Sequence, residues 1–235
     1  MKPKSVITAA VSAVALALLL AAASPARVSQ DKSPYPNMAP LEQYLMADRM
    51  AEIALARSAA PASISQDAEV LVLGRHGYET AVKGTNGFVC LVERSWDEGI
   101  QGTNFWNPQV RAPFCLNAAA AKFYLPRTIK KTALILAGRS KEQMFDALKA
   151  AVAANKLPPP EPGSVCYMMS KQGYLNDRDH HWHPHLMFYF SNTDPATWGA
   201  NLPGSPVIAI EQPEERLLTF LVPVRRWSDG SPDMP

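Results

Sequence analysis

Four of the chain's five histidines fall within six residues, in the run His180-His181-Trp182-His183-Pro184-His185. Imidazole binds transition metals and exchanges protons near neutral pH, so this run holds most of the chain's capacity for either chemistry. If the segment is extended, His181, His183 and His185 point to one face, because successive side chains of a strand alternate.

Two histidines on that face can share a metal ion, but three cannot do so without a bend. The backbones of His181 and His185 would lie about 13 Å apart at about 3.3 Å per residue, and a metal-to-nitrogen bond is only about 2.0 Å long. A bend at Pro184 would relax this limit. We therefore predict a site built on His181 and His183 and completed from elsewhere, with further candidates His185, His76, Asp177 and Asp179. Imidazole with carboxylate suits a divalent transition metal such as zinc or copper.

The same residues also have a plainer interpretation. Residues 171–184 are polar, which is typical of a solvated loop whose histidines have no specific role. His185 opens an apolar strand, where a buried imidazole bonded to the backbone is the ordinary outcome.

An aromatic loop is the second candidate binding feature. Residues 97–113 show no hydrophobic period, which predicts a long loop, and such loops are often functional. Trp96, Phe105 and Trp106 stand among asparagines there, a mixture that binds sugars, peptides or a protein partner. The alternative is that these aromatic side chains anchor the loop in the core.

Other catalytic patterns are weak. The sequence contains no Gly-rich phosphate loop, no nucleophile elbow and no His-Glu-x-x-His helix. Cys166 would need a neighbouring base to act as a nucleophile, and we expect an inert core thiol instead. We expect the adjacent carboxylates Asp97-Glu98 and Glu214-Glu215 on the solvated surface.

The start of the chain indicates export. Met1 to Ser5 is short and basic, and Val6 to Ala23 is apolar and free of charge. This pattern predicts a secretory signal peptide over residues 1–26, cleaved after Ala23 or Ala26. The alternative is an uncleaved membrane anchor, which would be the chain's only contact with a membrane. In either case we expect the folded part to be periplasmic or extracellular.

Charge and cysteine content narrow the partners and the compartment. The chain has 23 basic and 21 acidic residues, and loss of Lys2 and Lys4 with the signal would leave 21 of each. A nucleic-acid partner is not expected, because such proteins show a basic excess. In an oxidising compartment we favour a disulfide between Cys90 and Cys115, which leaves Cys166 over. The alternative is three buried thiols.

Hydrophobic periods and turn residues predict the elements. We expect one helix over Leu41 to Arg57, ended near Pro61, and an antiparallel meander whose tight turn is Asn86-Gly87. Further helices are expected over Leu116 to Tyr124, Thr128 to Ala137 and Lys141 to Lys156, the last behind the capping box that Ser140 opens. Strands are expected at Val70–Leu73, Tyr78–Lys83, Phe88–Glu93, Val165–Ser170, Leu186–Phe190, Val207–Ile210 and Leu217–Val222.

This order of elements predicts an α+β fold with a mostly antiparallel sheet, an N-terminal helix and a central helical segment. We divide the chain into a signal peptide (1–26), a linker (27–40), a single α+β domain (41–227) and a tail (228–235).

Several segments carry a resemblance to known sequences. They are residues 84–92, Pro113-Phe114-Cys115, Tyr167-Met168-Met169-Ser170 and the stretch from Pro184 to Tyr189. Together they resemble a group of exported bacterial proteins described only as hypothetical, over roughly Leu73 to Val222. The resemblance implies export and one shared fold, and it supplies no activity. It includes His185 but not His180 to His183.

The sequence therefore predicts an exported globular protein, either a non-catalytic binding module or one associated with the cell envelope, with a small-molecule or protein partner. The alternative is a metal-dependent enzyme or metal-binding protein that uses the cluster from His180 to His185.

Overall fold

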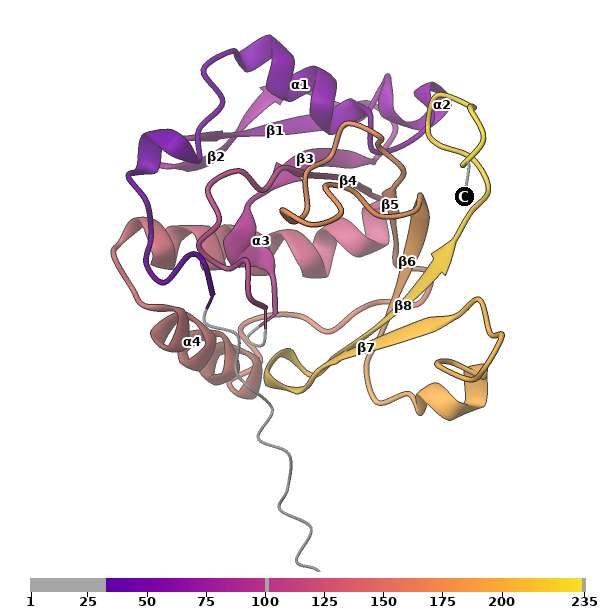
Figure 1. The fold of residues 1–235 in the computed structure, drawn as a ribbon. Helices are drawn as coiled ribbons and strands as arrows, with labels where there is room; N and C mark the ends of the chain where they lie inside the picture. Colours follow the sequence, from indigo (N-terminus) through magenta and orange to yellow (C-terminus); the bar gives the residue numbers. More distant parts are fainter. Residues whose placement is uncertain (1–32, 100–101, 234–235) are drawn as a thin grey trace, which may run out of the picture. The chain divides into compact units, whose positions relative to one another are not determined.

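Eight strands form a single sheet in the part of the chain that the computed structural model describes, residues 33–99 and 102–233 (Figure 1). The strand order is β2-β1-β3-β4-β5-β6-β8-β7, and every neighbouring pair is antiparallel except β1 with β3. The α+β fold predicted from the sequence is confirmed. The strands are β1 (Glu69–Gly74), β2 (Gly77–Val82), β3 (Val89–Glu93), β4 (Ala112–Leu116), β5 (Val165–Met168), β6 (His185–Phe190), β7 (Ile208–Gln212) and β8 (Leu217–Pro223).

Helices cover both faces of the sheet. Helix α1 (Arg49–Arg57) packs on β1, β3 and β4, and α3 (Ala118–Leu136) packs on the opposite face, against β2 to β5 (Figure 1). Helix α4 (Lys141–Ala153) packs on α3. The half of the sheet formed by β6, β8 and β7 extends beyond the main contacts of α3, which leaves room for a cavity over it.

Lys32–Pro235 form one compact unit. The predicted signal peptide lies outside the described residues. Among the residues that are described, no helix is long and apolar enough to cross a membrane.

The N-terminal helix is shorter than predicted. Instead of one helix over Leu41 to Arg57, a 3-10 turn, η1 (Leu41–Gln43), precedes α1. The cause is Asp48, whose carboxylate accepts hydrogen bonds from Met50 N and Ala51 N and so begins a new helix at Arg49. After Pro61 a single further turn, α2 (Ala62–Ser65), leads to β1.

The predicted hairpin at Asn86-Gly87 is wrong. The tight hairpin joins β1 to β2 through Arg75 and His76, and β3 instead runs parallel to β1 on its other edge. Asn86 uses its side chain to bind the Ile64 carbonyl and the Phe88 backbone N–H. Those bonds hold the connection between β2 and β3 against α2. This connection carries the chain across to the other edge of β1.

The central helices are one continuous helix rather than two. Asn117 caps α3 by accepting a hydrogen bond from Ala120 N at 2.9 Å. Pro126 lies inside the helix and lacks the N–H that would continue the ladder. The Arg127 side chain adds a bond beside this interruption, because its Nη1 donates to the Phe123 carbonyl at 2.7 Å.

Strand β4 was not predicted, because its sequence lies across the expected loop 97–113 and the expected helix at Leu116. All five of its residues are buried. A strand buried on both faces shows no alternation of polar and apolar residues, and so no period of two.

Helix α4 agrees best with its prediction. The Ser140 hydroxyl accepts from Gln143 N while the Gln143 side chain accepts from Ser140 N, which confirms the capping box. The helix ends at Ala153, three residues before the predicted end at Lys156.

Both predicted flexible ends are held where they are described. In the expected linker, Tyr35 donates a hydrogen bond to Asp177 at 2.6 Å and Ser33 donates to the Thr103 carbonyl at 2.6 Å. In the expected tail, Ser228 N donates to the Met169 carbonyl at 2.9 Å.

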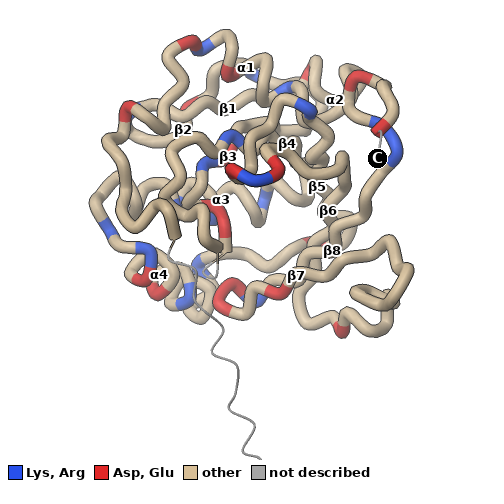
Figure 2. Tube along the Cα trace, in the orientation of Figure 1, with Lys and Arg blue, Asp and Glu red and all other residues tan. Residues whose placement is uncertain are grey.

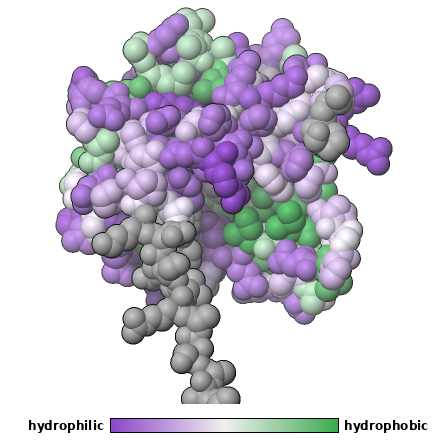
Figure 3. Space-filling view, in the orientation of Figure 1, coloured by the Kyte–Doolittle hydropathy of each residue, from purple (hydrophilic) through white to green (hydrophobic). Residues whose placement is uncertain are grey.

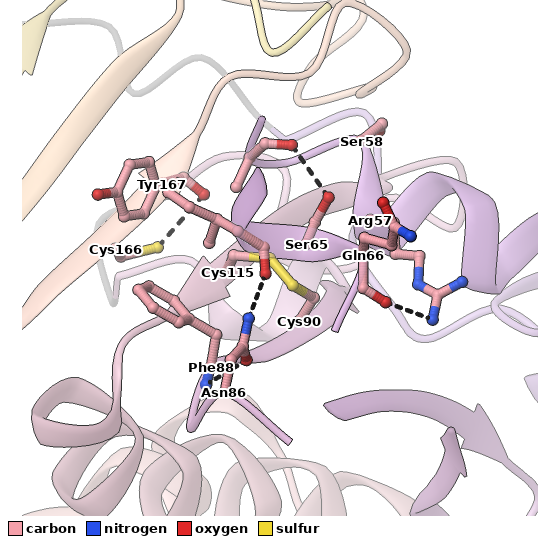
Figure 4. Close-up of a disulfide and its surroundings, with 12 residues drawn as sticks. Arg57, Ser58, Ser65, Gln66, Asn86, Phe88, Cys90, Cys115, Cys166 and Tyr167 are labelled. Atoms are coloured by element: carbon pink, nitrogen blue, oxygen red, sulfur yellow. Dashed lines mark hydrogen bonds between the residues drawn. A yellow bond between two sulfur atoms is a disulfide. The ribbon is translucent and has the colours of Figure 1, made fainter. Parts of the chain in front are cut away.

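The structure pairs Cys90 with Cys115 in a disulfide between facing positions of β3 and β4 (Figure 4). Cys166 lies opposite Leu116, among the side chains that face α3, whereas the disulfide lies among those that face α1. Alternation along β4 and β5 therefore places the third cysteine on the other face of the sheet.

A buried ion pair ties α1 to the sheet. Arg94, directly after β3, donates to Glu52 of α1 at 2.8 Å, and both side chains are almost fully buried. The Arg94 guanidinium also donates to the Tyr44 and Val92 carbonyls, and Glu52 accepts from Leu73 N at 3.1 Å. The pair thus joins η1, α1, β1 and β3.

We predict that Glu52→Gln lowers the free energy of unfolding by about 3 kcal/mol, because it leaves the buried Arg94 charge without its counter-ion. Urea denaturation measures the loss. The control is Glu79→Gln, which removes an equally simple pair, Arg49–Glu79, whose side chains are 50% and 58% exposed. We expect this control to cost less than about 1 kcal/mol, and equal losses in both variants would contradict the assignment.

Candidate functional site

The histidine run does not form one cluster. His180 stacks on Tyr174, and His181 lies against Trp227. His183 Nδ1 lies 2.6 Å from Asp233 Oδ2, and His185 Nδ1 lies 2.7 Å from the His183 carbonyl oxygen. His185 is buried at the start of β6, as the plainer interpretation of the sequence predicts, and burial lowers its pKa.

The other predicted metal ligands are occupied or distant along the chain. Asp179 is paired with Arg178 at 2.7 Å, and Asp177 accepts hydrogen bonds from Tyr35, Asn107 and Tyr174. His76 belongs to the β1–β2 turn. Over residues 33–99 and 102–233, no three His, Cys, Asp or Glu side chains are arranged to hold a metal ion. The predicted ligand set is therefore not assembled.

The aromatic loop is anchored in the core. Trp96 is fully buried and donates from Nε1 to Thr132 Oγ1 at 3.0 Å, and Phe105 is 2% exposed. Trp106 is partly buried and packs edge-on against Phe105. Trp96 and Phe105 thus hold the loop in place, as the alternative interpretation of the sequence predicts, and Phe105 and Trp106 also line a cavity of about 470 Å³.

A cluster of buried charges is the feature that the sequence did not predict. Glu93 ends β3, Asp97 ends the 3-10 turn η2 (Ser95–Asp97), and Glu215 ends the turn η4 (Pro213–Glu215). Arg127 and Lys131 of α3 face these carboxylates, and all five side chains are buried. Asp97 and Glu215 were expected on the solvated surface. They are buried instead, because η2 packs on α3 and η4 packs on α4.

Glu215 and Glu93 have close partners within this cluster, whereas Asp97 does not. Lys131 Nζ lies 2.8 Å from Glu215 Oε1, and Arg127 Nε lies 3.5 Å from Glu215 Oε2. Thr128 donates to Glu93 at 3.3 Å. Neither carboxylate oxygen of Asp97 makes a hydrogen bond of normal geometry with a described residue. Asp97 is therefore buried without a side-chain hydrogen bond, and the attraction of Lys131 and Arg94 offsets its burial only in part.

Burial raises the pKa values of Asp97 and Glu93 in this cluster. It raises the pKa of Asp97 to about 7, against the opposing attraction of Lys131. Burial and the neighbouring charge of Asp97 raise the pKa of Glu93 well above its ordinary value. Burial alone would lower the pKa of Lys131, but the charges of Glu215 and Asp97 raise it. A carboxyl group that titrates near pH 7 is suited to binding or proton transfer.

Two cavities flank the cluster. The larger, which we call the sheet cavity, has a volume of about 380 Å³ and lies over β6, β8 and β7, with Glu215 in its wall. The smaller, which we call the turn cavity, has a volume of about 210 Å³ and lies beside η2, with Glu93 and Asp97 in its wall. Figure 2 marks the acidic turn η4 beside α4, and Figure 3 shows hydrophobic surface gathered over β6, β8 and β7.

The sequence carried one signal for this cluster. Tyr124, Thr128 and Lys131 recur at helical spacing along α3 and form a polar stripe on this helix. Such a stripe on a central helix indicates buried polar partners. Nothing in the sequence around Asp97 or Glu215 identifies those partners, because they come from turns far away along the chain.

Cys166 is a buried free thiol, and burial raises its pKa well above the ordinary value. A thiol that resists ionisation is a poor nucleophile, so Cys166 is a core residue.

No known protein family matches the chain, and searches of curated proteins and of solved structures also find no match.

We predict that Asp97→Asn makes the protein more stable at pH 8 by on the order of 2 kcal/mol. The folded pKa of Asp97 is raised, so folded chains keep a proton that unfolded chains lose between about pH 4 and pH 7. The free energy of unfolding of the native chain therefore falls as the pH rises through this window. The free energy of unfolding of Asp97→Asn falls less.

Urea denaturation at pH 5, 6, 7 and 8 measures both profiles. The control Asp146→Asn makes the same change at an exposed position of α4 and should keep the native profile. Parallel profiles for the native chain and Asp97→Asn would contradict the raised pKa.

Proposed function

We propose that the protein is an exported, non-catalytic binding module, and that its sheet cavity takes a small ligand with an apolar body and a positive charge. One observation carries this proposal. Among the described residues, the lining joins an apolar wall to three glutamates and contains no lysine or arginine.

The apolar wall suits the body of such a ligand. Met187, Ile210 and Leu221 come from three adjacent strands, and Phe145 faces them from α4. Ile210 is 46% exposed, so apolar surface stands uncovered at the cavity. Small-molecule sites commonly have volumes of about 300 to 1,000 Å³ and mostly apolar linings.

The glutamates of the sheet cavity suit the positive charge of the proposed ligand. Glu215 is already neutralised by Lys131, but Glu211 and Glu214 form no ion pair with any described residue. They leave a net negative potential at the cavity, which attracts a cation. The rings of Tyr124 and Tyr189 line the same space and add a surface that favours cations.

A binding role fits this lining better than catalysis. No serine, cysteine, histidine or lysine is among the described side chains that line the sheet cavity, so these nucleophiles are not present there. Its glutamates could accept protons, but we assign them to binding a cation. Export is supported by the apolar segment Val6 to Ala23 and by the Cys90–Cys115 disulfide, because disulfides persist in oxidising compartments.

Isothermal titration of the purified chain tests the proposal with three probes of similar size: 2-phenylethylammonium, neutral 2-phenylethanol and anionic 3-phenylpropionate. We expect the cation to bind about tenfold more tightly than the neutral probe, with an affinity that weakens as salt is added. The anion should bind most weakly. Equal affinities for the cation and the anion would overturn the proposal.

A charge reversal at the cavity wall locates the site. We predict that Ile210→Lys weakens binding of 2-phenylethylammonium at least about tenfold, because it removes apolar contact and places a like charge beside the ligand. The matched control is Ile129→Lys, since Ile129 is 48% exposed on α3 and does not line the cavity. A control that weakens binding as much as Ile210→Lys would place the ligand elsewhere.

A further inference from the structure

The turn cavity is a separate space with its own chemistry. It shares no lining residue with the sheet cavity, so an inference about it stands or fails independently of the function proposed above. Its polar wall comes from the end of β3 and from η2, and its apolar wall comes from Val110, Ala112 and Leu175.

Three buried oxygen atoms in this wall lack partners. Both carboxylate oxygens of Asp97 and the hydroxyl oxygen of Ser95 are without a hydrogen bond of normal geometry to the described residues. Asp97 is 8% exposed and Ser95 is 1% exposed. Buried polar atoms are nearly always paired, and leaving one unpaired costs free energy. The atoms that would complete this cavity therefore belong to a group with several hydrogen-bond donors.

The missing donor should also carry positive charge. The basic side chains that act on Asp97 have carboxylate partners of their own, since Arg94, which also lines the cavity, is paired with Glu52, and Lys131 is paired with Glu215. Glu98 adds a second carboxylate to the lining. A metal ion is a poor fit, because no described group of three His, Cys, Asp or Glu side chains could hold one. An ammonium ion fits better, since it carries three or more donors and accepts longer contacts than a metal.

We propose that the turn cavity binds the primary ammonium group of a small alkylamine, whose N–H donors bond to Asp97 and Ser95 while its alkyl part lies against Val110, Ala112 and Leu175. The cavity volume of about 210 Å³ holds only a short chain of carbons.

The site has a built-in dependence on pH. The charged groups that act on Asp97 are Glu93 and Arg94 beside β3, Lys131 of α3, and Glu215 of η4, and Glu98 lies in the same wall. Burial among them holds the pKa of Asp97 at about 7. Only the ionised carboxylate pairs with ammonium, so the fraction of competent protein rises about tenfold between pH 6 and pH 8.

Titration of the 15N-labelled chain with ethylammonium chloride, followed by nuclear magnetic resonance, tests this site. Sodium chloride at equal ionic strength is the reference. We expect the amide signals of residues 93–98 to shift, with a dissociation constant about tenfold lower at pH 8 than at pH 6. The absence of shifts at pH 8, or equal affinity at both pH values, would overturn the proposal and leave water as the occupant of the cavity.

Variants separate binding from folding. Asp97→Asn keeps the shape of the side chain and should weaken ethylammonium binding at least about tenfold and remove its pH dependence. Ala112→Leu fills the cavity without changing any charge and should also abolish binding. Asp146→Asn, exposed on α4, is the matched control and should bind as the native chain does. Native affinity in both Asp97→Asn and Ala112→Leu would refute the site.

The source of the ammonium group is distinguished by a second probe, Nα-acetyl-lysine methylamide, which carries the same group on a peptide. A free alkylamine as ligand predicts weaker binding of this probe than of ethylammonium, because the peptide does not fit the cavity. Tighter binding of the peptide would assign the ammonium group to a lysine of a partner protein.

Discussion

The buried ion pair between Arg94 and Glu52 is the contact on which the rest of the arrangement depends. Arg94 stands between the last residue of β3 and the turn η2, and its guanidinium reaches α1 and the backbone after η1. A guanidinium with no exposure to water must keep all its partners, because an unpaired buried charge costs several kcal/mol. This requirement fixes where β3 ends and where η2 turns. Since Ser95, Trp96 and Asp97 follow directly, the same requirement positions the wall of the turn cavity.

In the buried cluster beside this ion pair, acidic and basic side chains are not matched one to one. Three carboxyl groups face two basic side chains, and Asp97 receives no hydrogen bond of normal geometry from the described residues. A core built only for stability would replace these groups by apolar ones of similar volume, because burying charges repays its cost only with full pairing. Proteins keep such destabilising arrangements mainly at functional sites. This cost is why we propose a ligand site at the cluster, beside the two cavities.

The sequence predicted the local elements better than the contacts between them. The capping box at Ser140 and the strand at Leu217 could be recognised because their signals are local. The parallel pairing of β1 with β3 could not, since Asn86-Gly87 is the stronger hairpin signal, whereas the hairpin forms at Arg75-His76. The buried acids were missed for the same reason: a carboxylate in a turn looks solvated until the helix that covers it is known. The histidine run could not be resolved from composition, because its spacing does not show that His183 lies beside Asp233 or that His185 contacts a backbone carbonyl.

Lys131 connects the two cavities electrostatically. Its ammonium group contacts Glu215 in the wall of the sheet cavity, and its charge also acts on Asp97 in the wall of the turn cavity. The attraction of both carboxylates keeps Lys131 charged although burial opposes it. A cation bound at Asp97 would weaken one of these attractions, and a cation near Glu215 would weaken the other. Because linkage between two sites is reciprocal, we expect occupancy of either cavity by a cation to disfavour occupancy of the other. The strength of this coupling depends on Lys131, whose charge acts on both walls although its side chain lines neither cavity.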